Sequence, residues 1–368
     1  MTPLPPGSTI GILGGGQLGR MLALAGYPLG IRVRSLDPAA DAPAGVLSEL
    51  FVGQYDDAAT LARFADGVDV ITYEFENVPV ATARQLAQFC PVYPPPLALE
   101  KAQDRLVEKS FLRDLGIPTP PFLPVDSLAE LEAAVTQIGL PAVLKTRRMG
   151  YDGKGQAVLR QPQDVATAWA SLQGAPLILE GWVNFDREVS LLAVRATTGE
   201  TAFYQLVENE HREGILRISR APTPHVTPAL QTLAESYGQR VLIALDYVGV
   251  LAIEFFQVGE TLFANEMAPR VHNSGHWTIE GATTSQFANH IRAILGLPLG
   301  ETKAIGQSVM LNLIGTIPDA AAVLAVPGAY LHLYGKAPRP GRKLGHITVR
   351  ADDEQTLAAR RVALSRLV

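Results

Sequence analysis

Two carboxylates twelve residues apart are the feature of this sequence that predicts chemistry most directly. Glu254 lies in GVLAIEFF and Glu266 in FANEMAPR, and the two strand-like runs read as a hairpin around Gly259. Neighbouring strands would hold both acids on one face, where they repel each other unless a cation lies between them. Because Mg²⁺ binds carboxylate and phosphate oxygens, the pair predicts a magnesium site, to which Asn265 could add an oxygen ligand. The alternative is that each acid pairs with an arginine.

A lysine followed by a glycine-rich loop predicts the binding of a polyphosphate. Lys145 ends the apolar run PAVLK, and the loop MGYDGKGQ follows it with a second cation, Lys154. Such a loop can cover phosphate groups that the lysine holds. Glu180 ends a later strand pattern, LILEGWV, where it could bracket an adenine and a ribose. Each of these residues alone is also typical of a solvated strand end.

Directly after the two acids, the segment APRVHNSGHW gathers further polar side chains. An arginine such as Arg270, close to magnesium-bound phosphate, stabilises the charge that develops in phosphoryl transfer. A zinc site is the alternative, but the Pro- and Gly-flanked loop lacks the helix that would align His272 with His276.

The stretch GILGGGQLGR near the start carries the pattern Gly14-x-Gly16-x-x-Gly19. With Asp37 at the end of the second predicted strand, it satisfies the dinucleotide-binding pattern. A tight glycine turn is equally what any first strand-to-helix crossover needs. Both interpretations stay open on the motif alone.

The elements that position these residues fall into four predicted segments. The first hundred residues alternate strand and helix patterns, which indicates a parallel sheet, and the proline-rich VYPPPLAL marks its end. AQDRLVEKSFLRDLG predicts a linker helix, and a small α+β layer follows it. The predicted domains are 1–100, Rossmann-like; 101–185, linker helix and lid; 186–300, metal and nucleotide layer; and 301–368, a strand-rich tail packing on the core.

Composition excludes several classes of function. A net charge of -5 without clustered Lys and Arg gives no footprint for nucleic acid. Cys90 is the single cysteine, so neither an intrachain disulfide nor a thiolate zinc site can form, which fits a reducing cytoplasm. No apolar run reaches membrane-spanning length, and no targeting segment is recognised. The expectation is a soluble cytoplasmic protein with small-molecule partners.

Taken together and in order, the motifs resemble the ATP-grasp ligases, and more closely the 5-(carboxyamino)imidazole ribonucleotide synthase family. The resemblance covers nearly the whole chain, and YEFENVP and APRVHNSGHWTIE separate this family from the related transformylases and biotin carboxylases. The matching stretches are GILGGGQLGRML, YEFENVP, KSFLRDLGIPTP, VLKTRRMGYDGKGQ, ILEGWV, ENEHREGILRIS, NEMAPRVHNSGHWTIEGATTSQFANHIRAILG and YGKAPRPGRKLGHIT.

The resemblance implies an ATP-grasp fold of α/β and α+β layers with an N-terminal preATP-grasp domain and a small C-terminal domain. It implies Glu254 and Glu266 as ligands of Mg²⁺ or Mn²⁺. The implied catalytic residues are Arg270, Lys145, Tyr151 and Asp152. The implied ATP contacts are Arg105, Lys145, Gly150, Tyr151, Asp152, Gly153, Lys154, Gly155, Gln156, Glu180, Gly181, Trp182, Val183, Glu188, His211, Asn265 and Glu266. The implied ribonucleotide contacts are Gln17, Leu18, Glu74, Tyr151, Asp152, Arg270, His272, Asn273, Lys336, Arg342 and Lys343.

The activity implied by the resemblance is carboxylation of 5-aminoimidazole ribonucleotide with ATP and bicarbonate, through carboxyphosphate, by a homodimer in purine biosynthesis. The glycine turn would then contact the sugar-phosphate substrate, and Asp37 would be an ordinary strand-end acid. One departure is Met149, where the family usually has glycine in the covering loop. A dehydrogenase and a non-catalytic nucleotide sensor are the rival functions.

Overall fold

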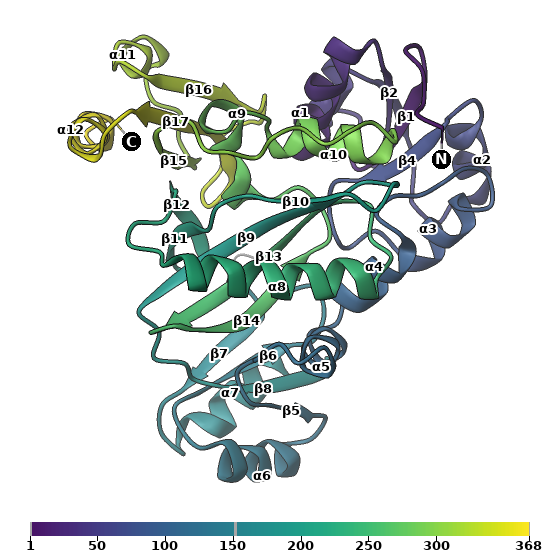
Figure 1. The fold of residues 1–368 in the computed structure, drawn as a ribbon. Coiled ribbons are helices and arrows are strands. Elements are labelled where there is room, and N and C mark those ends of the chain that lie inside the picture. Colours follow the sequence, from purple (N-terminus) through teal and green to yellow (C-terminus); the bar gives the residue numbers. More distant parts are fainter. Residues whose placement is uncertain (1, 151–152, 368) are drawn as a thin grey trace.

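The structure is a computed structural model that describes residues 2–150 and 153–367. Its N-terminal layer is a parallel sheet, as the sequence predicts, and its four strands lie in the order β3-β2-β1-β4 (Figure 1). The first strand, TIGIL, is buried at every position, as strands covered on both faces must be. The elements of this layer are β1 (Thr9–Leu13), α1 (Gln17–Gly26), β2 (Arg32–Asp37), β3 (Glu49–Val52), α2 (Ala58–Ala65), β4 (Val70–Tyr73) and α3 (Val80–Leu86).

Two short helices connect this layer to the next, where the sequence predicts a single helix. α4 (Pro96–Ala102) begins inside the proline-rich segment, because a proline at the first helical position loses no hydrogen bond. α5 (Arg105–Asp114) begins after Asp104, whose carboxylate caps it by accepting from the N–H of Leu106 at 3.0 Å. The prediction therefore misses α4 and starts the second helix too early.

A small antiparallel sheet in the order β5-β8-β6-β7 forms the second layer. Its strands and helices follow the predicted order, and Leu131, Leu144 and Leu179 lie in its fully buried core. Lys145 lies near the end of one of its central strands and pairs in register with Ile178 of the other. The elements are β5 (Phe122–Val125), α6 (Leu128–Ile138), β6 (Ala142–Thr146), β7 (Gln156–Leu159), α7 (Asp164–Leu172) and β8 (Leu177–Gly181).

A nine-stranded sheet spans the rest of the described chain in the order β14-β13-β9-β11-β12-β15-β17-β16, with β10 on β9. The helix α8 (Pro228–Ala244) packs against β9 and β13 (Figure 1). One run that reads as a single strand, ETAFYQLVE, is interrupted and forms β10 and β11. The strands are β9 (Arg187–Arg195), β10 (Thr201–Phe203), β11 (Val207–Arg212), β12 (Ile215–Ala221), β13 (Gly249–Val258), β14 (Thr261–Ala268), β15 (Gln307–Ile314), β16 (Ala329–Leu333) and β17 (Lys343–Ala351).

The tail strands are hydrogen-bonded into this large sheet, since β12 pairs with β15 and β15 pairs with β17. The sequence predicts only that the tail packs on the core, and the domain boundaries it proposes stay predictions. Four further helices complete the fold: α9 (Thr278–Gly281), α10 (Gln286–Ile294), α11 (Ala320–Leu324) and α12 (Glu354–Ser365).

The N-terminal layer and the large sheet share one apolar core, in which α1 packs against α10. Leu22 and Ile291 are both fully buried in it, together with Leu192 of β9. This shared core fixes the N-terminal glycine turn relative to the two acids on β13 and β14. No helix in the described part of the chain is long and apolar enough to cross a membrane.

Candidate active site

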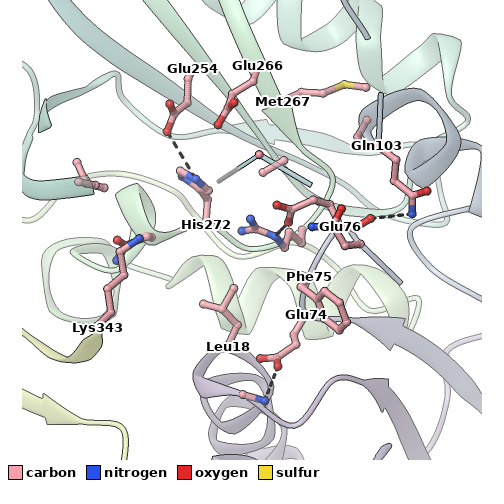
Figure 2. A pocket seen from close by; sticks show the side chains of 18 of the residues that line it. Leu18, Glu74, Phe75, Glu76, Gln103, Glu254, Glu266, Met267, His272 and Lys343 are labelled. Atoms are coloured by element: carbon pink, nitrogen blue, oxygen red, sulfur yellow. Dashed lines mark hydrogen bonds and ion pairs between the residues drawn. The ribbon is translucent and has the colours of Figure 1, made fainter. Parts of the chain in front are cut away.

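One cavity of about 450 Å³ lies where the N-terminal layer, the large sheet and the tail meet. Figure 2 shows acids from β13 and β14 on one side of it and Glu74 on the other, close to α1. It brings together much of the predicted site. The predicted residues that line it are Gln17, Leu18, Glu74, Arg105, Gly150, His211, Glu254, Glu266, Arg270, His272, Asn273, Lys336 and Lys343.

The remaining predicted residues fall into two groups. Tyr151 and Asp152 lie outside the described residues. The others are described but are not among the residues that line the cavity: Lys145, Gly153, Lys154, Gly155, Gln156, Glu180, Gly181, Trp182, Val183, Glu188, Asn265 and Arg342. Most of this second group are predicted ATP contacts, so the cavity corresponds mainly to the predicted metal and ribonucleotide residues.

Glu254 and Glu266 lie on neighbouring strands, as the sequence predicts, and they pair directly because a bulge between Glu254 and Phe255 shifts the register of the β13–β14 hairpin. Burial and repulsion from Glu266 raise the pKa of Glu254. Burial also opposes ionisation of Glu266, but the Arg105 guanidinium, 3.0 Å away, shifts its pKa downward overall. The arginine-pairing alternative therefore holds for Glu266 only, because the residue within ion-pair distance of Glu254 is a histidine, His272, with Nε2 at 3.6 Å from Oε1 (Figure 2).

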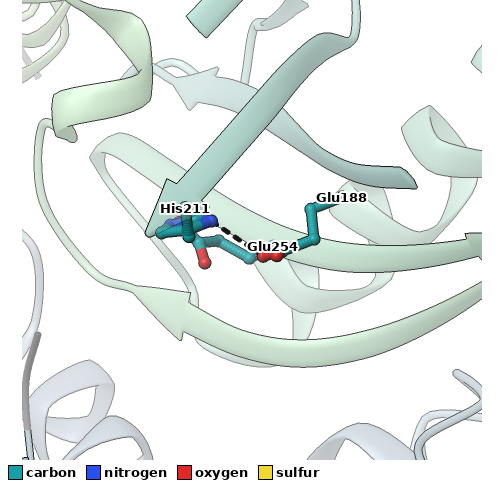
Figure 3. Close-up of side chains that lie close together, drawn as sticks. All are labelled: Glu188, His211 and Glu254. Atoms are coloured by element: carbon teal, nitrogen blue, oxygen red, sulfur yellow. Dashed lines mark ion pairs between the residues drawn. The ribbon is translucent and has the colours of Figure 1, made fainter. Parts of the chain in front are cut away.

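A second group of ligand-type atoms shares Glu254 (Figure 3). One side-chain atom each of Glu188, His211 and Glu254 lies within 4.8 Å of the others. The Nδ1 of His211 is 2.9 Å from Oε2 of Glu188, and although burial opposes it, these carboxylates raise the pKa of His211. Excess negative charge thus surrounds Glu254, and the oxygen-rich donor set, with Glu266 opposite, fits a hard divalent cation such as Mg²⁺.

The glycine turn is filled by carboxylates of the chain itself. The N–H of Gly19 donates to Oε2 of Glu74 at 2.6 Å, and the N–H of Gly16 donates to the other oxygen of the same carboxylate. The N–H of Gly15 donates to Oδ2 of Asp37 at 2.8 Å. These amides are therefore engaged within the chain. The expectation that the turn contacts a sugar-phosphate stays a prediction, which Gln17 and Leu18 on the cavity wall would carry. Asp37 is not an ordinary strand-end acid, because it holds the turn in place.

Glu76 is a cavity-lining residue that the sequence analysis missed. Its Oε2 accepts from Nε of Arg270 at 2.5 Å, and Arg270 holds the pKa of Glu76 below its usual value against the effect of burial. Gln103 fixes the backbone here by donating from Nε2 to the carbonyl oxygen of Glu76 at 2.8 Å (Figure 2). The sequence signal that could identify Glu76 is its position in YEFEN, two residues after the predicted contact Glu74.

The tail supplies two of its three predicted cations to the cavity. Lys336 and Lys343 line it, and the ammonium of Lys336 donates to the side-chain oxygen of Gln17 on α1. Burial lowers the pKa of Lys336. Arg342 instead donates from Nη1 to the carbonyl oxygen of Ala337 at 3.1 Å, an exposed contact within its own loop.

Asn273 is held by an amide pair, and Met149 has a positive φ angle. Asn273 forms a reciprocal amide pair with Asn312 of β15, with distances of 3.0 and 2.7 Å, so the tail also fixes this residue. Met149 lies on the cavity wall with φ of 61°, in the left-handed region that favours glycine. The non-glycine residue in the loop therefore sits at a position of backbone strain.

Three family models match successive parts of the chain. The ribonucleotide synthetase preATP-grasp domain matches residues 8–103. The ATP-grasp domain matches residues 110–287. The phosphoribosylaminoimidazole carboxylase C-terminal domain matches residues 308–360.

Similar proteins match almost end to end. The N5-carboxyaminoimidazole ribonucleotide synthase of Pseudomonas aeruginosa is 58% identical over 98% of this chain and 99% of its own length. The crystal structure of the synthetase from Thermus thermophilus is 62% identical, covers 98% of both chains and superposes with a TM-score of 0.95. The Aspergillus clavatus enzyme in complex with ADP and 5-aminoimidazole ribonucleotide is 33% identical, with a TM-score of 0.91 over 98% of this chain and 99% of that one. The chain belongs to the N5-carboxyaminoimidazole ribonucleotide synthase family and is an ATP-grasp ligase.

Proposed function

We propose that the protein carboxylates the exocyclic amine of 5-aminoimidazole ribonucleotide, using ATP and bicarbonate and releasing ADP and phosphate. The observation that carries this proposal is the shared cavity, in which the paired acids Glu254 and Glu266 face Arg270 and the tail cation Lys336. A site that holds a pair of acids together with cations from the core and the tail suits a metal-bound triphosphate and a phosphorylated sugar.

Mg²⁺ fits the oxygen ligands of Glu254 and Glu266, and Mn²⁺ would suit the same oxygen atoms. When bound, the metal ion neutralises phosphate oxygens and polarises them for transfer. Arg105 already contacts Glu266 at 3.0 Å and Gly150 at its carbonyl oxygen, at 3.2 Å. It is therefore placed to contact phosphate oxygens between the metal acids and the glycine loop.

In the first step, cationic side chains stabilise the negative charge on the phosphoryl group that is transferred. Bicarbonate attacks the γ-phosphorus of ATP, the bond to ADP breaks, and carboxyphosphate forms. Lys145 and Arg270 stabilise the phosphoryl oxygens in this transfer, in which positioning and charge stabilisation supply most of the catalysis. The pairing of Arg270 with Glu76 fixes the direction of its guanidinium before substrate arrives.

In the second step the amine nitrogen of the ribonucleotide bonds to the carboxyl carbon. The carbon–oxygen bond to phosphate breaks, or carbon dioxide released within the site is captured, and the nitrogen gives up one proton. Water must be excluded because carboxyphosphate hydrolyses readily. The role of the loop 150–156 as the cover, with Tyr151 and Asp152, stays a prediction.

The test is ADP formation with bicarbonate, measured with and without 5-aminoimidazole ribonucleotide. Wild-type protein should release ADP faster with the ribonucleotide, and Glu266→Gln should lose at least about a hundredfold in kcat, since it removes a metal ligand. Glu260→Gln, on the exposed end of the same hairpin, is the matched control. Nucleotide binding without turnover would favour a sensor, and full activity of Glu266→Gln would refute the metal assignment.

The proposal extends to a homodimer acting in the cytoplasm, where the lone Cys90 would remain reduced. Light scattering of the purified protein should then give twice the chain mass of 39.4 kDa. A monomeric mass across the working concentration range would refute the dimer without touching the catalytic assignment.

A further inference from the structure

Lys109 is a fully buried lysine that the reaction scheme above does not use. Its side chain has 0% exposure, and lysine is rarely buried to this degree unless its charge is paired. From α5 its Nζ lies 3.2 Å from Oε2 of Glu180 on β8 and donates to the carbonyl oxygen of Asn265 on β14 at 2.9 Å. One ammonium group thus connects the small sheet to the strand that carries Glu266.

Glu180 is shared between two lysines. The same Oε2 atom accepts from Nζ of Lys145 at 2.9 Å, and the three side chains are 0%, 3% and 12% exposed for Lys109, Glu180 and Lys145. The other oxygen, Oε1, is buried and has no hydrogen-bond partner in the described part of the chain. Although burial raises it, the two ammonium groups bring the pKa of Glu180 down to about 2, so this carboxylate is charged.

The net charge of Lys109, Lys145 and Glu180 decides whether Lys145 can bind a phosphate. With Lys109 present, the group of two ammoniums and one carboxylate carries one net positive charge. Without Lys109, Glu180 and Lys145 would form a neutral pair in a buried setting, and Lys145 would be the one ion-pair partner left to the carboxylate in the described part of the chain. An incoming phosphate would then have to compete with Glu180 for Lys145.

The neighbours of Lys109 on α5 fix the other side of Glu266. The side-chain oxygen Oε1 of Glu108 accepts from the N–H of Met267 at 2.6 Å, while Lys109 donates to the carbonyl oxygen of Asn265. The two peptide units that flank Glu266 are therefore both tied to α5, and Arg105 contacts the carboxylate of Glu266 itself. A single helix sets the spacing between the metal acid and the phosphate lysine.

We propose that Lys109 is a positioning residue: it offsets the negative charge of Glu180, so that Lys145 is not the sole counter-ion of that carboxylate and can contact nucleotide phosphates, and it ties β14 to the sheet that carries Lys145. This inference rests on the proposed role of Lys145. Lys109 itself is not among the residues that line the cavity and does not touch substrate.

The test compares Lys109→Met in two backgrounds. In the wild-type background we expect the KM for ATP to rise at least tenfold and kcat to fall, with the KM for the ribonucleotide changed less than twofold. In a Glu180→Gln background the competing charge is gone, so the same substitution should change the KM for ATP less than threefold. Such dependence on the partner residue is what a double-mutant cycle detects.

Lys303→Met, at an exposed position, is the control for loss of a lysine, and thermal unfolding checks that each variant is folded. If Lys109→Met does not fold, the comparison of Lys109→Met/Glu180→Gln with Glu180→Gln still decides. An equal rise in the KM for ATP in both backgrounds, or none in either, would overturn the proposal. Failure of the proposed function is seen separately, as wild-type protein without ribonucleotide-stimulated ADP release.

Discussion

The carboxylate of Glu74 accepts a hydrogen bond of 2.6 Å from the backbone N–H of Gly19, in the first turn of α1. Its other oxygen accepts from Gly16, so a side chain from the end of β4 occupies the place where a dinucleotide-binding turn holds a phosphate. The start of a helix attracts anions, and here the anion belongs to the chain. A glycine pattern typical of cofactor binding thus connects β4 to α1 through hydrogen bonds to Glu74, and we call this connection the Glu74 joint.

We predict that the wild-type protein does not bind nicotinamide dinucleotides. The N–H groups of Gly15, Gly16 and Gly19 are already engaged by Asp37 and Glu74, so a pyrophosphate would have to displace two carboxylates. Titration with NADH, followed by its fluorescence, should show no saturable signal up to millimolar concentration. Saturable binding would restore the dehydrogenase interpretation.

The same joint should contribute to stability. Glu74→Gln keeps one acceptor oxygen of the two, so one buried N–H loses its partner, which costs about 1–3 kcal/mol. Urea unfolding of the variant should show a decrease in the free energy of unfolding of this size. Glu132→Gln, at an exposed position of α6, should change it by less than about 0.5 kcal/mol. Equal losses in the two variants would contradict the joint.

Replacing Glu76 should affect both folding and catalysis. Glu76→Gln leaves the guanidinium of Arg270 without its carboxylate partner, whose side chain is 28% exposed against 15% for the arginine. With allowance for partial screening by solvent, we expect a loss of about 1–3 kcal/mol in the free energy of unfolding and at least a tenfold loss in kcat.

The control for Glu76→Gln is Glu100→Gln, which breaks the exposed ion pair with Arg84. Those side chains are 45% and 62% exposed, so stability should change by at most about 1 kcal/mol. Unfolding curves of both variants give the change in the free energy of unfolding, and ADP release gives the change in kcat. Unchanged kcat in Glu76→Gln would show that Arg270 does not depend on this partner.

Glu108 should make stability depend on pH. Burial and repulsion from Glu266 raise its pKa from 4.5 to about 8. Between these values the folded protein keeps a proton that the unfolded chain has lost, so the free energy of unfolding falls as the pH rises through this window. Below pH 4.5 both states are protonated and the contribution is complete.

Glu108→Gln removes this titration while keeping an oxygen that can accept from Met267. In metal-free buffer, the decline in unfolding free energy from pH 5 to pH 8 should be smaller than in wild type, by roughly 3–5 kcal/mol. Chemical denaturation at several pH values measures the difference. Parallel pH profiles for the two proteins would show that Glu108 ionises normally.

Lys336 should contribute to ribonucleotide affinity and not to ATP affinity. Lys336→Ala removes a cation from the cavity wall, and a charged hydrogen bond to phosphate is worth about 1.5–3 kcal/mol. The KM for 5-aminoimidazole ribonucleotide should rise at least about tenfold while that for ATP stays within twofold. Lys303→Ala, at an exposed site, should change neither constant. An unchanged ribonucleotide KM would remove the phosphate assignment.

What the sequence predicts well is local. The hairpin itself follows from the two strand patterns and the short turn, so the sequence places both acids on neighbouring strands. Their direct pairing does not follow, because the register set at the turn would place Glu254 opposite Asn265, and a bulge next to Glu254 brings Glu266 there instead. The start of α5 at Asp104 is also a local signal, because Asp is a preferred residue at the beginning of a helix.

What the sequence does not predict are partners set by the tertiary fold. Asp37 and Glu74 reach the glycine turn from later strands, and the partners of Lys109 lie on β8 and β14. Nothing local distinguishes such side chains from solvated ones, because their burial depends on layers that meet only after folding. The contact of Glu180 with both Lys109 and Lys145 also depends on the tertiary fold.

The pairing of β12 with β15 limits how the tail can be exchanged during evolution. The strands that carry the metal acids and the strands that flank the tail cations belong to one hydrogen-bonded lattice. Cutting the tail away would open a strand edge in the middle of that lattice and invite aggregation. Replacing the tail alone would therefore disturb the sheet that carries the proposed metal acids, so the proposed ATP and ribonucleotide residues are expected to be inherited together.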